Sequence, residues 1–172
     1  MTLFRKKCLQ MMQNQIQKNH MDIPWHQFTG SDKSLPITQT GLTEKASVIG
    51  RTGLMMLSCG TGAWRVRSSM NSLATLLGVT CTADIGLMSI EYTCFDGTDC
   101  YSQSLCLTNT GVNTSKLNRL ERFVNDFDHE CCTMSGEQIH TYLDQIEQIH
   151  GLYSPFAPVS YTHLRAHETR GN

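Results

Sequence analysis

A change of hydrophobic period in the middle of the chain constrains the fold most. Over residues 87–94 and 101–107, apolar and polar side chains alternate, which is typical of strands with one buried face. Asp96 and Gly97 lie between these segments and favour a β-hairpin turn, because both tolerate positive φ better than most residues. Residues 79–83 are a candidate third strand. The middle of the chain therefore predicts a small antiparallel sheet.

Helical periodicity precedes this sheet. Apolar side chains recur at spacings of three and four over 44–59 and again over 63–77. Gly60 and Gly78 follow these segments as helix-ending residues. The link between the two segments is short, so we expect the two helices to be antiparallel neighbours.

Two more helices are predicted after the sheet. One covers residues 114–128, and the other begins after Ser135, whose spacing to Gln138 matches a capping box. The stripe predicted for this last helix consists of Ile139, Leu143, Ile146 and His150. The order of elements predicts an α+β fold in which two helix pairs flank a small antiparallel sheet with a β-hairpin.

The chain divides into three expected parts. Residues 1–43 form a weakly ordered, polar lead-in that contains Pro24 and Pro36, and Met21 is a second candidate translation start. Residues 44–154 form the folded domain. Residues 155–172 are a truncated end.

The composition excludes several classes of function. The net charge of −1 gives no electrostatic basis for binding nucleic acid or an anionic membrane surface. No apolar run approaches the roughly 18–20 residues that a membrane-spanning helix needs, and no secretory signal precedes the domain. The eight cysteines lack any C-x-x-C pair, which favours free thiols in a reducing compartment and predicts no metal site and no cofactor.

Residues that could carry catalysis are present but poorly arranged. Ser58, Asp126 and His129 could be written as a triad, but no strained nucleophile elbow surrounds Ser58. Glu91 and Asp96 are expected to be solvated rather than to act as a carboxylate pair. His129 beside Cys131 and Cys132 lacks the ligand spacing of a zinc site. We therefore expect that the chain has no catalytic residues and that it is not an enzyme.

The end of the chain resembles a translated sequencing adapter. The segment VSYTHLRAHET at 159–169 matches one reading frame of a transposase-type library adapter over eleven consecutive residues. Its histidines, His163 and His167, have a spacing that could bind zinc on a helix. Because of the adapter match, we exclude residues 159–172 from functional reasoning.

Three segments carry a resemblance to a known family. They are GLMMLSCGTGAWRVRSSMNSLATLLG at 53–78, TADIGLMSIEYTCFDG at 82–97 and TGVNTSKLNRLERFVNDF at 110–127. Together they resemble the cytosolic N-terminal domain of the threonine/serine exporter (ThrE-like) family. The Leu143-Asp144-x-Ile146 pattern also fits, so that the resemblance covers roughly residues 45–154.

The resemblance also directs attention to the start of the second helix. The family pattern there has a small-residue turn and an aromatic-Arg-Val unit, and in this chain its positions are Gly60, Gly62, Trp64, Arg65, Val66 and Gly78. Arg65 with Trp64 is the candidate binding pair, since a guanidinium near a helix N-terminus could bind a carboxylate. The alternative is that Trp64 packs and Arg65 bridges to a neighbouring acidic residue. Arg67 departs from the family, where many relatives carry an acidic residue.

The resemblance implies the soluble cytosolic part of an exporter of threonine, serine or similar small amino acids, truncated before its transmembrane segments. The intact protein would lie in the cytoplasmic membrane. Its implied partners are the missing membrane domain or a separate membrane subunit, and the amino-acid substrate; a homo-oligomer stays open. The alternatives are a non-catalytic regulatory or assembly domain and, with less support, a soluble hydrolase.

Overall fold

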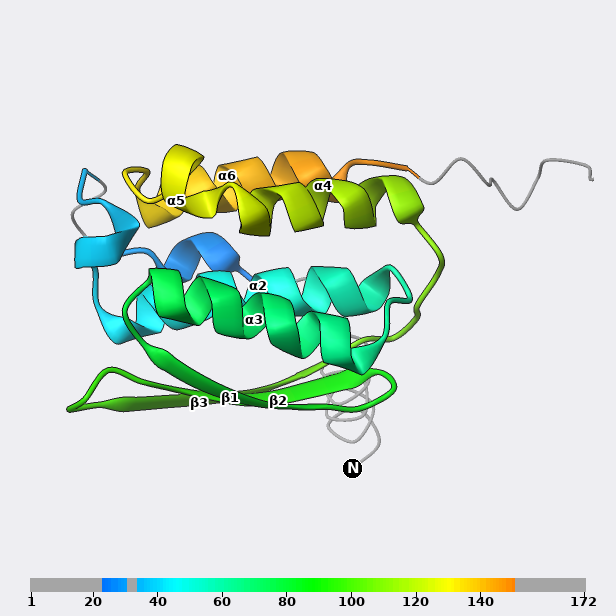
Figure 1. The fold of residues 1–172 in the computed structure, drawn as a ribbon, viewed down its shortest axis with the longest axis horizontal. Coiled ribbons are helices and arrows are strands. Elements are labelled where there is room, and N and C mark those ends of the chain that lie inside the picture. The colour runs from blue at the N-terminus through cyan, green and yellow to red at the C-terminus, as the bar shows by residue number, and fades with distance from the viewer. Residues whose placement is uncertain (1–22, 31–33, 151–172) are drawn as a thin grey trace, which may run out of the picture.

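A three-stranded antiparallel sheet forms one outer layer of the fold. The structure, a computed structural model, describes residues 23–30 and 34–150 (Figure 1). The sheet has the order β1-β2-β3, with β1 at Thr80–Ile85, β2 at Ser89–Phe95 and β3 at Cys100–Cys106. The predicted hairpin is confirmed between β2 and β3, and Gly97 has the positive φ of 106° that the turn requires. The predicted third strand is also confirmed, as β1.

Two antiparallel helices, α2 (Leu42–Ser58) and α3 (Ala63–Leu76), cover one face of the sheet (Figure 1). Both were predicted, and α2 begins two residues earlier than expected. The helix α2 is buried on nearly all sides, because it lies between the sheet and a further layer of helices. Its glycines allow this close approach: a Cβ on Gly50 would overlap the Tyr92 hydroxyl, and one on Gly53 would lie 2.6 Å from Met70 Sδ.

The further layer consists of α4 (Thr114–Asn125), α5 (Phe127–Glu130) and α6 (Gly136–Glu147), which pack on the side of α2 away from the sheet (Figure 1). The α+β class is therefore confirmed, with both layers of helices on the same side of the sheet. The single helix expected over 114–128 is interrupted at Asp126. This break lets Phe127 turn into the core, where its ring lies 5.4 Å from that of Phe123.

The last helix begins as predicted and ends earlier. Ser135 Oγ accepts from the Gln138 backbone N–H at 3.3 Å, and Gln138 Oε1 accepts from the Ser135 N–H at 2.9 Å, which completes the capping box. The apolar stripe stops at Ile146. The assignment of His150 to this stripe was wrong, because α6 ends at Glu147 and His150 lies exposed beyond it.

The described part of the expected lead-in supplies core side chains. Two short 3₁₀ helices, η2 (Trp25–Phe28) and η3 (Ile37–Gln39), bury Trp25 and Ile37 against the domain. Single buried residues such as these do not belong to a repeating hydrophobic pattern, so the sequence did not reveal that they would be buried. The tail at 151–172, with its adapter-like segment, lies outside the described residues. Within the described ranges, no helix is both long enough and apolar enough to span a bilayer.

Candidate functional site

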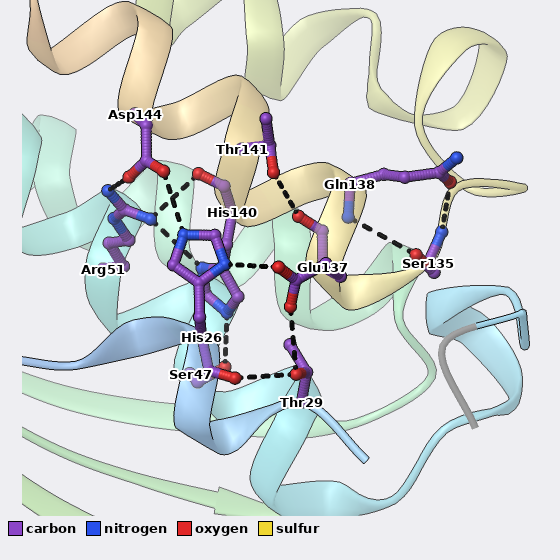
Figure 2. A network of polar contacts seen from close by, with 10 residues as sticks. All are labelled: His26, Thr29, Ser47, Arg51, Ser135, Glu137, Gln138, His140, Thr141 and Asp144. Atoms are coloured by element: carbon purple, nitrogen blue, oxygen red, sulfur yellow. Dashed lines mark hydrogen bonds and ion pairs between the residues drawn. The ribbon is translucent and has the colours of Figure 1, made fainter. Parts of the chain in front are cut away.

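A buried polar network joins α2, α6 and η2 (Figure 2). At its centre is Arg51, whose side chain is almost fully buried. The Arg51 guanidinium donates to Asp144 Oδ1, to Glu147 Oε2 at 3.0 Å and to the His140 carbonyl at 3.0 Å. Its Nε is the one buried side-chain nitrogen or oxygen among the described residues without a hydrogen-bond partner. Arg51 therefore links the middle of α2 to residues 140, 144 and 147 of α6.

The hydrogen bonds of the network assign the tautomer of His140. Ser47 Oγ donates its single hydrogen to the Glu44 carbonyl at 2.7 Å, so it must accept from His140 Nε2 at 3.0 Å. Nδ1 then carries no hydrogen and faces Arg51 Nη1 at 3.4 Å. Burial, together with the charges of Arg51 and His26, lowers the pKa of His140 to about 3. His140 is thus a neutral structural side chain at physiological pH.

His26 fastens η2 to α6 through two carboxylates. Its Nδ1 lies 3.0 Å from Glu137 Oε1 and its Nε2 lies 2.9 Å from Asp144 Oδ2 (Figure 2). Only an imidazolium can donate to both carboxylates at once. Burial acts to raise the pKa of Asp144, but the hydrogen bonds from Arg51 and His26 outweigh it and the pKa is lowered. The site therefore holds charges in fixed pairs, which is an arrangement suited to holding segments together.

Glu44 makes a second link between the lead-in and the domain. Its Oε2 accepts from the Gly30 backbone N–H at 3.0 Å. Its Oε1 lies beside Gly136, the first residue of α6, where a Cβ would overlap the carboxylate. A carboxylate at a helix N-terminus is favourable, since it lies at the positive end of the helix dipole. The absence of a side chain at Gly136 allows this approach.

The turn between α2 and α3 holds the candidate binding pair. Gly60 adopts a φ of 75°, and Gly62 is the N-cap residue of α3. Arg65 Nη1 lies 3.4 Å from Glu121 Oε1 on α4, and the Arg65 guanidinium lies 5.4 Å from the centre of the Trp64 ring. Both side chains remain accessible, since Trp64 is 70% exposed and the Arg65 side chain is 43% exposed. Such an exposed ion pair contributes little stability.

The remaining motif positions have structural roles. Val66 lies on the buried face of α3, and Gly78, which follows that helix, has a φ of 69°. Arg67 donates from Nε to the Ala83 carbonyl on β1 at 3.0 Å and so joins α3 to the sheet.

The other candidates from the sequence do not assemble. Ser58 Oγ donates to the Met55 carbonyl at 2.7 Å at one end of the molecule, whereas α5, which carries His129, lies at the other (Figure 1). Cys132 Sγ donates to the Asp128 carbonyl. In the ranges 23–30 and 34–150, no three His, Cys, Asp or Glu side chains are arranged to hold a metal ion.

The exposed face of the sheet has a shallow depression that is open to solvent. The depression, of about 610 Å³, lies over the three strands and is lined mainly by hydroxyl and carboxylate side chains. Glu91 lies opposite Asp84 in the register of β1 and β2. Asp96 lies outside the depression and caps the hairpin, where backbone hydrogen bonds from Asp99 and Thr98 lower its pKa.

A comparison with family models identifies the chain. Residues 47–164 match the ThrE family, described as "Putative threonine/serine exporter". The chain belongs to this family. No curated protein and no solved structure gives a match. The matched range of the ThrE model includes most of α2 and every later element of the fold. It therefore contains Arg51, its partners on α6 and the Arg65 turn, whereas His26 on η2 lies outside it.

Two of the segments that carry the ThrE resemblance, 53–78 and 110–127, meet at one end of the domain. The Gly111 N–H donates to the Ser58 carbonyl at 3.1 Å, and a Cβ on Gly60 would lie 3.7 Å from Val112 Cγ2. The start of α4 therefore packs directly on the α2–α3 turn, and Asn113 caps α4 by accepting from the Lys116 N–H at 3.0 Å.

Sequence reasoning missed the network around Arg51. One signal was available: Arg51 is the only charged residue in the segment 46–59, and such a charge must find a partner if it is buried. His140 and Asp144 are four residues apart on the last helix and therefore share a face. Nothing in the sequence indicated that His26, more than a hundred residues away, would complete the cluster.

Proposed function

We propose that this chain forms the cytosolic part of a membrane exporter of threonine, serine or similarly small amino acids. Membership in the ThrE family carries this proposal, since the family is one of amino-acid exporters. In the proposed arrangement the domain faces the cytosol, and the membrane-spanning part is supplied by further segments or by a separate subunit. The chain itself acts in transport and not as an enzyme.

Within this function, we assign Arg65 and Trp64 to the binding of a carboxylate. The Arg65 guanidinium holds Glu121 at the long distance of 3.4 Å and stays partly exposed, so its other nitrogens are available to a second anion. It also lies in the first turn of α3, whose backbone N–H groups add positive potential. The carboxylate belongs either to the substrate or to a partner segment.

A titration separates these two sources. If the substrate supplies the carboxylate, adding threonine to the 172-residue chain shifts the NMR resonance of Arg65 Nε–H and leaves that of Arg51 unchanged. An unchanged Arg65 resonance at saturating threonine assigns the carboxylate to a partner segment. In that case the runner-up function is favoured, a regulatory or assembly domain that controls the membrane part without touching substrate.

The exporter proposal is tested by efflux from cells that make the intact protein. Cells loaded with labelled threonine or serine should release it faster than matched cells without the protein, and unlabelled serine should compete with labelled threonine. Equal release from both cell lines would contradict the function.

The cytosolic placement is tested by thiol labelling. Cys100 is exposed on β3, whereas Cys94 is buried, so Cys100 is the reporter of choice. A membrane-impermeant thiol reagent should label Cys100 only after lysis, in a variant whose other exposed cysteines are replaced by serine. Labelling of intact cells, with control cytosolic thiols still protected, would place the domain outside.

A further inference from the structure

Three loops meet at the same end of the molecule as the Arg65 turn (Figure 1). The first consists of residues 60–65, which are the turn after α2 and the first turn of α3. The others are residues 86–88 between β1 and β2, and 107–113 between β3 and α4. Hydrogen bonds hold them together: the Leu107 N–H donates to the Met88 carbonyl at 2.7 Å, and the Gly111 N–H donates to the Ser58 carbonyl at 3.1 Å. We call this end of the molecule the loop end.

The loop end exposes the most accessible large apolar side chains of the described residues. Leu87 is 89% exposed, Val112 is 77% exposed and Trp64 is 70% exposed, and each belongs to a different loop. The three loops contain one charged side chain, that of Arg65, and no carboxylate. The nearby Glu121 carboxylate lies on α4 and is paired with Arg65. Exposed apolar residues are normally scattered among charges, so three apolar tips on loops without a carboxylate are unusual.

The described chain also leaves the domain at the loop end. After α6 the backbone returns beside the start of α4, where Asn113 Nδ2 donates to the Ile149 carbonyl at 2.9 Å. The family match continues past this point to residue 164. The three loops and the last described residues therefore lie at the same end of the molecule (Figure 1).

We propose that the loop end rests on the lipid bilayer, with Trp64, Leu87 and Val112 inserted among the lipid headgroups and upper acyl chains. This inference rests on the proposed function, since it requires the domain to lie at a membrane. A tryptophan ring suits the interface because its body is apolar and its N–H is polar. The three loops themselves contain no carboxylate that anionic lipid would repel, and the charge of the nearby Glu121 is offset by its ion pair with Arg65.

The emission of Trp64 provides a direct test. The chain has two tryptophans, and Trp25 is buried, so a vesicle-induced change in emission reports on Trp64. We expect vesicles of phosphatidylcholine and phosphatidylglycerol in equal parts to shift the emission of the 172-residue chain to shorter wavelength. Acyl-chain-brominated lipid should quench it. The Trp64→Phe variant, which keeps only Trp25, should show neither change.

Matched pairs of variants locate the contact. Leu87→Ser with Val112→Ser should weaken vesicle binding about ten-fold or more, since each apolar side chain loses its burial in lipid. The control pair, Leu76→Ser with Phe95→Ser, removes exposed apolar side chains from the opposite end and should leave binding within roughly two-fold. Melting curves by circular dichroism verify that all four sites tolerate the change.

Two results would overturn the inference. In the first, vesicle binding does not depend on the loop end: both pairs of variants lose it equally, or only the removal of residues 151–172 abolishes it. In the second, Trp64 emission does not respond to vesicles although the intact protein exports threonine. That second result would leave the exporter function standing and show that the loop end contacts protein rather than lipid.

Discussion

Two arginines in this domain have opposite environments. Arg51 is buried between α2 and α6 and donates to two carboxylates and a backbone carbonyl. Arg65 lies at the loop end, half exposed, with one long ion pair to Glu121 and a tryptophan ring beside it. A buried charge is costly unless it is paired, so the pairs of Arg51 hold the fold together. An exposed, loosely paired charge contributes little to stability and remains available to a ligand or partner.

The largest expected effect comes from removing the buried guanidinium. Arg51→Met should lower the free energy of unfolding by about 3 kcal/mol, because the substitution removes three hydrogen bonds. Their acceptors are the His140 carbonyl and the partly exposed carboxylates of Asp144 and Glu147. Arg65→Met is the matched control and should cost less than about 1 kcal/mol. Urea denaturation at neutral pH measures both. Equal losses would remove the contrast between the two regions.

Close packing on α2 gives the next contrast. Gly50→Ala should destabilise by about 2 kcal/mol although alanine favours helices, because its Cβ would overlap the Tyr92 hydroxyl. Gly111→Ala at the loop end meets no atom within 4 Å and should change stability by less than about 0.5 kcal/mol. Thermal melts of the two variants suffice. A stabilised Gly50→Ala variant would show that α2 packs more loosely than described.

Acidification should weaken the buried network through His140. Its folded pKa of about 3 lies below the unfolded value near 6.5, so the unfolded state takes up the proton first as the pH falls. The contribution of neutral His140 is complete above about pH 6.5 and declines toward pH 3, by about 1.4 kcal/mol per pH unit at the steepest. The groups facing it are Arg51, His26, Asp144 and Glu137.

The variant His140→Gln isolates this effect. Between pH 7.5 and 5, above the range of ordinary carboxylates, its free energy of unfolding should fall less steeply than that of the unmodified domain. Parallel pH profiles of the two proteins would show that His140 is not the group responsible.

The smallest expected effect concerns the acidic partner of Arg65. Glu121→Gln removes an exposed ion pair and should change stability by less than about 0.5 kcal/mol. If the pair competes with an external carboxylate, the same change should strengthen any response of Arg65 to threonine in the NMR titration. A large loss of stability would instead make Arg65 and Glu121 a structural pair.

The sequence was most informative where side chains repeat with a period. The helices α2 and α3, the hairpin of β2 and β3, and the capping box at Ser135 all follow from local patterns that fixed spacings reveal. The turn with Gly60 and Arg65 could also be named in advance, because it lies in a motif.

What the sequence could not provide depends on contacts between distant residues. His26 meets Glu137 and Asp144 across more than a hundred residues, and no local spacing encodes such a meeting. The break at Asp126 likewise reflects the burial of Phe127 in the core, because the helical pattern of the sequence continues through it. The side of the sheet on which the second helix layer packs is also a tertiary outcome.

Efflux by an Arg65 variant tests the central claim most directly, that the loop end carries function while the Arg51 network carries stability. In cells that make equal amounts of intact protein, Arg65→Ala should lower the rate of threonine efflux by about ten-fold, the loss expected for one charge-assisted hydrogen bond. Arg65→Lys should restore it only partly, since an ammonium lacks the two-pronged geometry of a guanidinium. An unchanged rate in Arg65→Ala would make Arg65 an ordinary surface charge and contradict the account.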